Sequence, residues 1–567
     1  MADSGNKALR SAFSKFYTLI KADRKDFYSI YAYSIFSGLL QLTLPLGIQT
    51  IIGFVLAGSV STSIVVLIIL VVAGVFFTGL LQVKQMQVIE KIEQKIFVRY
   101  AFEFTDRLPK INIQKMDNYY LPELVNRFFD TMSLQKGLAK LLLDIPTATI
   151  QMVFGLMLLS FYHPVFIVFG IALFILLILI LRFSSVKGME TNMLASDYKY
   201  RVAGWIEEIA RTIKTFKYSK GTSLHLEETN DLTRGYLTSR TAHFKILQQQ
   251  YSSLIAFKVL ITAAMLIVGS ILLVDQQLNV GQFVAAELVI LMVINAVEKF
   301  IINLDKVYDV LTALEKLGKV TNSEKETEGS INLPIKKRGV AVRFDEVSFR
   351  YTDSDPILHK LSFDILPGQH VAIMGDSGSG KSSLLRLLTG AFNKFDGAVL
   401  IDNIPVGNYN LQSLRSQTGI LLSTQDIFKG TLLDNITMGN ANIALEDVTT
   451  LAEITGLSTF VQQQQAGYDY LLDPAGKRLS KKHIQSILLM RALLGSHRLL
   501  LLEEPCHYID KQHLHKILSF FKKDIDATII IATNDATIAS SCDRILLLNN
   551  GGIYANGDWE TVKNIMP

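Results

Sequence analysis

Charged residues are scarce in this chain of 567 residues, and cysteine is almost absent. Asp, Glu, Lys and Arg make up 19% of the sequence, whereas hydrophobic residues make up 49%. This balance excludes a disordered chain, a collagen and an ordinary soluble enzyme of this length. Only two cysteines occur, Cys506 and Cys542, which excludes a secreted fold built on disulfide bonds. The net charge of +5 is too small to indicate nucleic acid as a partner.

Charge is missing altogether from one long segment. No Asp, Glu, Lys or Arg occurs at residues 27–83. Since a membrane-spanning helix needs about 20 apolar residues, two spans fit there, with a small, uncharged turn at residues 57–63. A second charge-free stretch at residues 145–181 fits another pair, and apolar runs at about residues 259–274 and 281–297 form a third. The sequence therefore predicts an α-helical domain with six spans in the lipid bilayer.

Lysine and arginine are distributed unevenly around these spans. The first 25 residues carry six, the segment 84–143 carries ten and the segment 182–258 carries twelve, whereas the three short turns carry none. The side of a membrane with the excess of Lys and Arg is normally the cytoplasmic one. We therefore expect a multi-pass protein of the inner or plasma membrane, with both termini and both long segments in the cytoplasm.

One acidic residue, Glu287, interrupts the last span. A carboxylate in the membrane is costly and usually faces a partner or a wet cavity. Two interpretations stay open: Glu287 lines a translocation path, or it is hydrogen-bonded across helices or near the outer interface.

After the spans the composition changes. Residues 321–330 are polar and typical of a linker, and from about residue 340 short β-rich runs alternate with helical patterns. We expect a transmembrane domain at residues 1–320, a linker at 321–339 and an α/β nucleotide-binding domain at 340–567.

The motif GDSGSGKS follows a buried-type strand at residues 371–374 and precedes a helix-forming run. Its glycines let backbone N–H groups curl around phosphates, and the helix N-terminus adds partial positive charge. Lys381 is expected to contact the β- and γ-phosphates, and Ser382 to ligate Mg²⁺. The expected phosphate-binding residues are Gly375, Asp376, Ser377, Gly378, Ser379, Gly380, Lys381, Ser382 and Ser383.

A second motif, LLLLEEP, ends an apolar run at residues 499–505. This strand is expected to lie beside the phosphate strand. Glu503 is expected to hold the Mg²⁺ shell, and Glu504 to orient or activate water.

Six paired spans followed by this phosphate-loop domain resemble a half-transporter of the ATP-binding cassette exporter type, from about Asp26 to the end of the chain. The resemblance implies ATP as the nucleotide, with Tyr351 stacking on adenine and Gln425 contacting Mg²⁺. It also implies a homodimer or a heterodimer with another half-transporter, with or without a periplasmic adaptor, and an exported substrate that the sequence does not identify. The membrane half is most similar to the type I secretion and bacteriocin exporters.

Several positions depart from the pattern of that family. The signature Leu-Ser-Gly-Gly-Gln is Leu-Ser-Lys-Lys-His here, at residues 479–483, which keeps Ser480. The metal-binding aspartate of the acid strand is Glu503, and the switch histidine is Asn534. We expect Ser480 and Asn534 still to contact bound nucleotide, but the changes predict slow turnover.

Three functions remain open. The first is an ATP-driven exporter subunit that works with a second half-transporter of higher ATPase competence. The others are a homodimeric exporter that still hydrolyses ATP and a membrane scaffold that binds ATP without significant hydrolysis.

Overall fold

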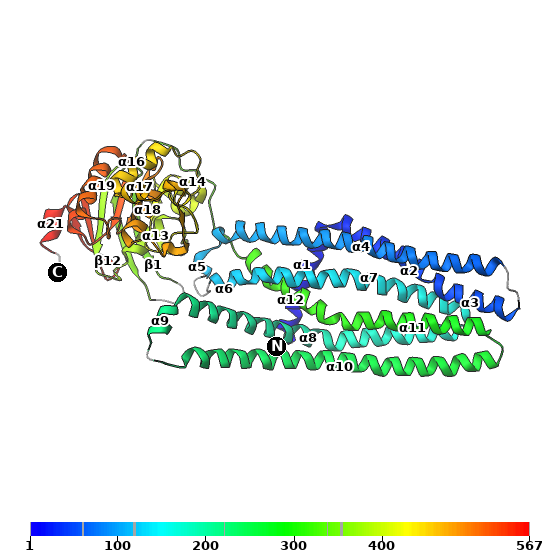
Figure 1. Cartoon of the computed structure of the whole chain (residues 1–567). Coiled ribbons are helices and arrows are strands. Elements are labelled where there is room, and N and C mark those ends of the chain that lie inside the picture. Colours follow the sequence, from blue (N-terminus) through cyan, green and yellow to red (C-terminus); the bar gives the residue numbers. More distant parts are fainter. Residues whose placement is uncertain are drawn as a thin grey trace. The chain divides into compact units, whose positions relative to one another are not determined.

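The computed structural model describes residues 2–58, 62–116, 121–219, 221–336, 338–351 and 355–565. The chain forms two compact units, coloured along the sequence in Figure 1. The first unit comprises Met1–Lys110 and Tyr119–Ser323, and the second comprises Ile111–Asn118 and Glu324–Pro567. Residues 59–61, within the predicted turn between the first two spans, lie outside the described residues.

The first unit is helical. Its helices are α1 (Ala2–Ala22), α2 (Arg24–Gln41), α3 (Thr43–Leu56), α4 (Thr62–Arg107), α6 (Leu121–Asn126), α7 (Asp130–Tyr162), α8 (Val165–Arg211), α9 (Ile213–Tyr218), α10 (Leu224–Val274), α11 (Val280–Ile302) and α12 (Leu304–Thr321). The break between α2 and α3 follows from Pro45, which lacks an N–H and whose ring clashes with the carbonyl four residues earlier, that of Gln41.

Six helical segments of the described chain are long and apolar enough to cross a membrane, which confirms the predicted number of spans. They are Arg24–Leu56, Thr62–Lys110, Leu121–Tyr162, Val165–Arg211, Leu224–Val274 and Val280–Thr321. The longest has 51 residues. At 1.5 Å per residue it extends about 77 Å, more than twice the ~30 Å apolar core of a bilayer, so these helices continue well beyond the membrane.

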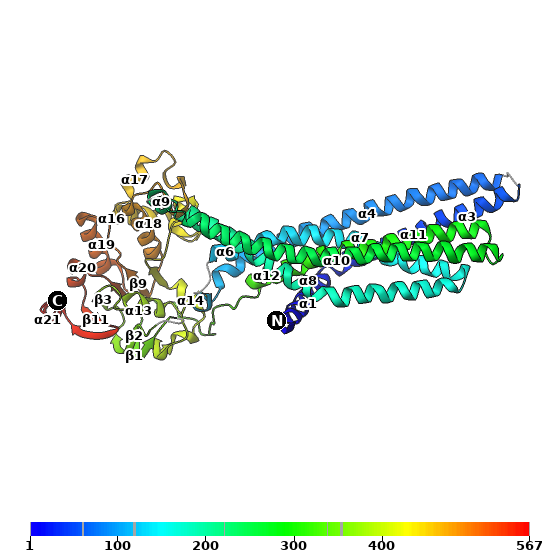
Figure 2. The same ribbon diagram turned by 90° about the horizontal axis from the view of Figure 1, so that it is seen from below.

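Neighbouring helices approach closely at glycines. A Cβ atom on Gly155 of α7 would lie 2.6 Å from Cγ2 of Val293 on α11, and one on Gly38 of α2 would lie 2.2 Å from Cγ2 of Ile150 on α7. Small residues permit such contacts between membrane helices, where packing rather than the hydrophobic effect drives association. Figures 1 and 2 both show α7, α10 and α11 running side by side, and α1 lying against α12.

Buried polar contacts tie α12 to its neighbours. Lys316 of α12 is fully buried and forms an ion pair with Asp197 of α8. Asp305 at the start of α12 accepts a hydrogen bond from Nε2 of the fully buried His243 on α10, at 3.3 Å. A buried charge is tolerated only when it is paired and hydrogen-bonded, so these contacts fix the position of α12 against α8 and α10.

The second unit is an α/β fold. Its strands are β1 (Val342–Phe349), β2 (Leu358–Ile365), β3 (His370–Gly375), β4 (Asp396–Ile401), β5 (Ile404–Pro405), β6 (Thr418–Leu421), β7 (Gly430–Thr431), β8 (Leu471–Leu472), β9 (Leu499–Glu503), β10 (Thr528–Ala532), β11 (Arg544–Asn549) and β12 (Gly552–Gly557). Its helices are α5 (Ile113–Met116), α13 (Lys381–Leu388), α14 (Leu411–Ser416), α15 (Leu432–Thr437), α16 (Leu445–Thr455), α17 (Ser458–Gln463), α18 (Lys481–Leu493), α19 (Lys511–Asp524), α20 (Ala536–Ser540) and α21 (Trp559–Lys563).

The main sheet has the strand order β12-β11-β3-β10-β9-β6 and is parallel except for β12. Strands buried on both faces read as continuous apolar runs, and β3, β9 and β10 do so. A separate antiparallel sheet has the order β2-β1-β4-β5. A helical six-span region followed by a phosphate-loop α/β domain is therefore confirmed as the fold class.

The predicted pairing of the acid strand is wrong. Strand β10 lies between β3 and β9, so β9 does not pair with the phosphate strand. The reason is that β10 is as apolar as β9, and adjacency between two such strands cannot be read from composition.

A piece of the first long polar segment belongs to the second unit. Asn112 donates its backbone N–H to the carbonyl of Glu324 at 2.9 Å. The amide of Gln114, in α5, donates to the carbonyl of Lys394 and accepts from its N–H, both at 3.4 Å. The loop between spans two and three therefore contributes hydrogen bonds to the α/β fold itself.

Replacing Asp197 by asparagine is expected to destabilise the first unit, because Lys316 would stay buried without its counter-charge. Removing one partner of a buried ion pair costs about 3–5 kcal/mol, and the partial exposure of Asp197 favours the lower value. Thermal denaturation of the detergent-purified protein should show a clearly lower midpoint. The exposed Asp231 of α10, replaced in the same way, is the control. Equal midpoints for the two variants would contradict this role of the ion pair.

Candidate nucleotide-binding site

The phosphate loop lies between β3 and α13, as the motif predicts. Gly375, Gly378 and Gly380 have φ values of +144°, +85° and +100°, which side chains other than glycine rarely adopt. A Cβ on Gly375 would lie 2.2 Å from the carbonyl oxygen of Leu548, whereas a Cβ on Gly378 would meet no atom of the other described residues within 4 Å, its chain neighbours apart. The loop is therefore packed at its base and open at its tip.

The remaining loop residues are arranged around this opening. Asp376 and Ser377 are exposed, and Ser379 is buried with its N–H donating to the carbonyl of Asp376 at 3.1 Å. The Oγ of Ser379 is buried without a hydrogen-bond partner among the described residues. A hydroxyl left unsatisfied in a phosphate loop fits a site that a ligand completes.

Lys381 begins α13 and already points into the loop. Its Nζ donates to the carbonyl oxygens of Gly375 and Asp376, at 2.5 and 3.0 Å. Burial lowers the pKa of Lys381, while the nearby carboxylates of Glu504, Asp376 and Glu503 oppose that shift. The ammonium group is thus held where phosphate oxygens would meet it.

Ser382 and Glu503 form a pair of oxygen donors. The Oγ of Ser382 donates to one carboxylate oxygen of Glu503 at 2.5 Å, and the other oxygen accepts from the N–H of Ser423 at 2.8 Å. Mg²⁺ prefers hydroxyl, carboxylate and water oxygens, so this pair fits such an ion. Glu503 therefore reaches α13 even though β10 separates the two strands.

Gln425 is not part of that pair. Its side-chain oxygen accepts a hydrogen bond from the backbone N–H of Leu422 at 3.4 Å, so the amide folds back onto its own loop. The contact of Ser423 with Glu503, two residues earlier, was not expected. The sequence offers no signal for it, because it uses a backbone N–H.

Glu504 is fixed against the end of β10. It adopts φ +43°, and its N–H donates to the carbonyl of Ala532 at 2.8 Å. Its carboxylate accepts from the hydroxyl of Thr533 at 3.0 Å and from the N–H of Asn534 at 3.2 Å. Thr533 was missed by sequence reasoning; it became informative only once β10 was known to lie between β3 and β9.

Asn534 connects Glu504 to the phosphate loop. Its side-chain oxygen accepts from the N–H of Gly375 at 3.2 Å. The structure therefore brings together residues at the ends of three neighbouring strands: the loop after β3, the two acids at the end of β9 and Asn534 after β10.

Tyr351 contacts α13, the helix that begins at the end of the phosphate loop. Its hydroxyl lies 3.1 Å from the Oγ of Ser383 and accepts from Arg386 at 3.0 Å. Its ring packs edge-on against Phe349 and Phe392. Arg386, which sequence reasoning missed, thus helps to hold the residue expected to contact adenine.

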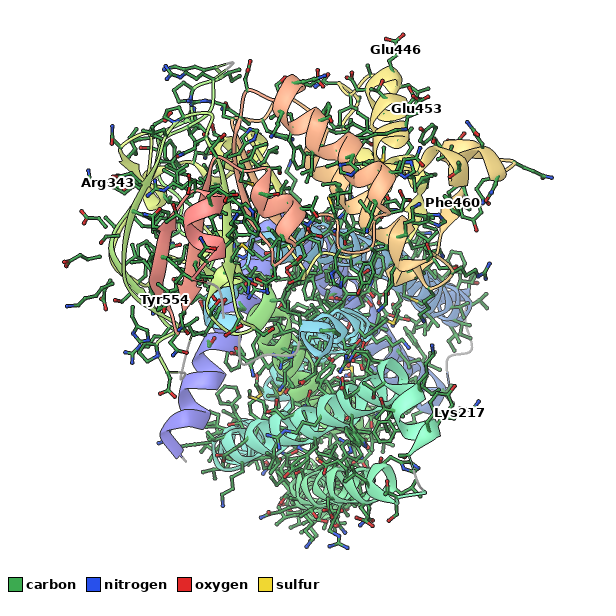
Figure 3. All side chains as sticks on the ribbon, turned by 90° about the vertical axis from the view of Figure 1, so that its left-hand side faces the viewer. Lys217, Arg343, Glu446, Glu453, Phe460 and Tyr554 are labelled. Carbon is green, nitrogen blue, oxygen red and sulfur yellow. The ribbon has the colours of Figure 1, made fainter. Side chains whose placement is uncertain are left out.

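The altered signature segment, residues 479–483, contacts other residues of the same chain. Ser480 caps α18 by accepting from the N–H of His483, at 3.2 Å. The ring of His483 packs on Phe460, with centroids 4.4 Å apart, and Phe460 is labelled in Figure 3. Burial and the neighbouring Lys482 both lower the pKa of His483, which favours its neutral form.

The two lysines of the signature contact the loop that follows Glu504. Nζ of Lys482 is 2.5 Å from the carboxylate of Asp510 and holds the pKa of that group well below its usual range. Nζ of Lys481 lies 5.1 Å from the ring centre of Tyr508. We call these two contacts, Lys482 to Asp510 and Lys481 to Tyr508, the signature clamp.

In the membrane span, Glu287 has one carboxylate oxygen, Oε2, that is buried without a hydrogen-bond partner among the described residues. Both interpretations of this residue remain predictions.

Two protein-family profiles match the chain. One, "ABC transporter transmembrane region", matches residues 29–297, and the other, "ABC transporter", matches residues 358–507. Together they cover about three quarters of the sequence. The chain belongs to the ABC transporter family. The resemblance inferred from the motifs is thereby confirmed: this is a multi-pass membrane protein with a transporter region and an ATP-binding region fused in one chain.

Individual relatives of this ABC transporter carry names that describe different functions. It is 32% identical to a cyclolysin secretion/processing ATP-binding protein, CyaB, of Bordetella pertussis over 53% of this chain and 43% of that protein. It is 29% identical to an ATP-dependent lipid A-core flippase of Burkholderia orbicola over 65% of this chain and 61% of that protein. The chain thus matches less than two thirds of the length of these two relatives.

A solved structure has the same fold. It is described as a bacterial Atm1-family ABC exporter with ATP bound, and it matches with a TM-score of 0.86 at 20% identity, over 96% of both chains. At this identity the likeness concerns the fold alone.

Replacing Lys381 by alanine is expected to weaken ATP binding by on the order of 10- to 100-fold, the value of one lost charge-assisted hydrogen bond. The measurement is equilibrium binding of a fluorescent ATP analogue to the purified protein. Lys429→Ala, an exposed lysine of the same unit, is the matched control. Unchanged affinity in Lys381→Ala would show that the loop does not hold the phosphates.

Proposed function

We propose that this ABC transporter exports a substrate across the membrane by ATP-driven alternating access, acting as a dimer. One observation carries the proposal: Lys381, Ser382, Glu503, Glu504 and Asn534 converge at the carboxyl edge of β3, β10 and β9. Nucleotide hydrolysis needs a cation that binds phosphate, oxygen ligands for Mg²⁺ and a carboxylate held in a fixed position. All three lie here at one edge of a parallel sheet.

Within a nucleotide-binding domain at residues 340–567, the loop N–H groups and Lys381 would hold the phosphates, and Tyr351 the adenine. Ser382 and Glu503 would hold Mg²⁺, joined by Gln425 once its amide leaves Leu422. When bound, the ion neutralises charge on the phosphate oxygens. The phosphate-binding set is Gly375, Asp376, Ser377, Gly378, Ser379, Gly380, Lys381, Ser382 and Ser383.

Glu504 would act as the base that orients and activates water. Its two hydrogen bonds, from Thr533 and from the N–H of Asn534, keep the carboxylate in one position. Geometry fixed in advance reduces the reorganisation needed in the reaction. Asn534 can accept or donate a hydrogen bond, but it cannot carry the positive charge of the histidine usual in this family.

The signature clamp is expected to slow turnover. In the family, the signature closes over ATP held by the opposite subunit, with backbone groups against the γ-phosphate. Here Lys481 and Lys482 occupy the glycine positions and are already bound to Tyr508 and Asp510. Closing a composite site would require the clamp to open or to move as a unit.

Two assemblies follow from this. In a homodimer both composite sites would contain the clamp, whereas a heterodimer with a more competent half-transporter would contain it in one site only. A periplasmic adaptor is compatible with either. Slow or absent turnover would instead favour the second candidate function, a membrane scaffold regulated by nucleotide binding.

The substrate stays open between two classes suggested by relatives, a secreted polypeptide, as the name of the cyclolysin secretion protein implies, and a lipid, as the name of the flippase implies. Coupling would use the first long loop, because Gln114 in α5 shares two hydrogen bonds with Lys394 of the α/β fold. The linker at residues 321–339 would join the two parts, and residues 1–320 would form the path.

Restoring the family residues is expected to raise ATP turnover by at least about tenfold, because each well-placed transition-state donor contributes about 10²–10³ in rate. The variant combines Lys481→Gly, Lys482→Gly, His483→Gln and Asn534→His, and turnover is measured as phosphate release by the purified chain. Adding Glu504→Gln to the same variant is the control and should abolish the gain.

Other outcomes separate the alternatives. Wild-type turnover at about 1–10 s⁻¹, a typical enzyme rate, without any gain on restoration would contradict the impairment. ATP binding without turnover in wild-type and restored chains, alone and with any half-transporter that copurifies, would favour the scaffold.

The orientation is tested by cysteine labelling with a membrane-impermeant reagent. We expect Gln276→Cys, in the turn between α10 and α11, to react in intact cells and Ser330→Cys to react only after lysis, because the Lys and Arg distribution puts the latter inside. The native thiols give little background, since burial raises the pKa of Cys506 and of Cys542 to about 12. Labelling of Ser330→Cys in intact cells would reverse the topology.

A further inference from the structure

The first unit contains a cavity of about 630 Å³ that the proposed export cycle does not use. It lies between α1, α2, α7 and the junction of α11 with α12. Its volume falls within the ~300–1,000 Å³ typical of small-molecule sites. Aromatic side chains form much of the wall contributed by α1 and α2: Phe13, Phe16, Tyr17, Phe27, Tyr28 and Tyr31.

The cavity lies at the boundary between charged and apolar sequence. On α2 its lining includes Phe27, the first residue of the charge-free stretch, and on α7 it includes Ile145, the first residue of the second such stretch. On α11 it includes Phe300, which directly follows Lys299. Tyrosine is enriched at this depth, where the apolar core of a bilayer meets its headgroups, and Tyr17, Tyr28 and Tyr31 line the cavity.

Two cations line the same cavity. Lys21, near the end of α1, and Arg24, at the start of α2, are both exposed and form no ion pair with a carboxylate within the described part of the chain. The nearest acidic residues in the sequence are already paired: Asp23 with Arg99 at 2.7 Å and Asp26 with Lys95 at 2.5 Å. Positive charge therefore remains available at the edge of an apolar wall.

Helix α1 is anchored so that it forms one side of this wall. Ala12 and Leu19 are buried, and Lys15 is bound to Glu315 of α12 at 2.6 Å. Phe13 and Tyr17 lie on the cavity side, and their exposed fractions are 49% and 68%. Large aromatic groups left this accessible beside an apolar cavity indicate a ligand that covers them.

We propose that this cavity binds an anionic phospholipid from the leaflet at this end of the spans. Its acyl chain packs among the aromatic and aliphatic side chains, and its phosphate contacts Lys21 and Arg24. A charge-free span of a second copy, such as residues 27–83 or 145–181, is a poorer occupant, because it would bury both cations without a carboxylate to pair them. A zwitterionic lipid has the same tail but carries its own ammonium group, so the site should prefer the anionic headgroup.

The test is a titration of the detergent-purified full chain with short-chain phosphatidylglycerol and, separately, with phosphatidylcholine of the same chain length, followed by native mass spectrometry. We expect the wild type to bind phosphatidylglycerol more tightly. A Lys or Arg near the surface contributes about fivefold in affinity for anionic lipid, so Lys21→Gln combined with Arg24→Gln should weaken phosphatidylglycerol binding by at least about tenfold. Binding of phosphatidylcholine should change by less than twofold.

Lys25→Gln is the matched control, because this exposed lysine is adjacent to Arg24 but does not line the cavity. It should leave the phosphatidylglycerol affinity within about twofold of the wild type, because its side chain does not line the cavity. A second variant, Ile145→Trp, fills the apolar part and should weaken both lipids together. Folding of every variant is checked by retained ATP binding.

Three results would overturn the proposal. One is equal affinity of the wild type for the two lipids. Another is unchanged phosphatidylglycerol affinity in the doubly neutralised chain. The third is efficient disulfide cross-linking between two copies through Tyr28→Cys, which would show that a second chain covers the cavity.

Discussion

The parallel register of β3, β10 and β9 is the constraint on which the nucleotide site depends. Ala532 of β10 lies opposite both Ile373 of β3 and Glu503 of β9. Strands β9 and β10 therefore end at one level and β3 continues only two residues further, to Gly375, so short hydrogen bonds can join the segments that follow. Because Asn534 follows the middle strand, it reaches Gly375 on one side and Glu504 on the other. A change in this register by one residue would separate all three groups.

The sequence predicted the features that depend on local chemistry. Spans follow from missing charge, and the glycines of the phosphate loop follow from the φ values that only glycine adopts readily. Features that depend on which strand pairs with which were not predictable. The position of β10 between β3 and β9 was missed, and with it the contact of Thr533. The contact of Ser423, which follows β6 on the other side of β9, was missed because it uses a backbone N–H. Gln425 was recognised by its motif, but the direction of its side chain depends on the fold of its own loop.

Two of the departures from the family pattern, Lys481 and Lys482, form one local structure. Lys482 pairs with Asp510, and Lys481 lies over Tyr508. Both lysines therefore contact the loop that follows the acid strand β9. The clamp therefore links the signature to the loop that follows the catalytic candidate Glu504.

In the first unit, polar contacts are concentrated on α12 rather than on the apolar α11. Lys316 and Asp305 of α12 are tied to α8 and α10, whereas α11 packs through residues such as Val289 and Val293. The two helices meet at Asn303, whose amide donates to Asp144 of α7 at 3.0 Å. Ion pairs in a buried setting are costly to break, whereas apolar surfaces can slide past one another. Any rearrangement of the membrane helices should therefore carry α12, α8 and α10 together and concentrate the change of angle at Asn303.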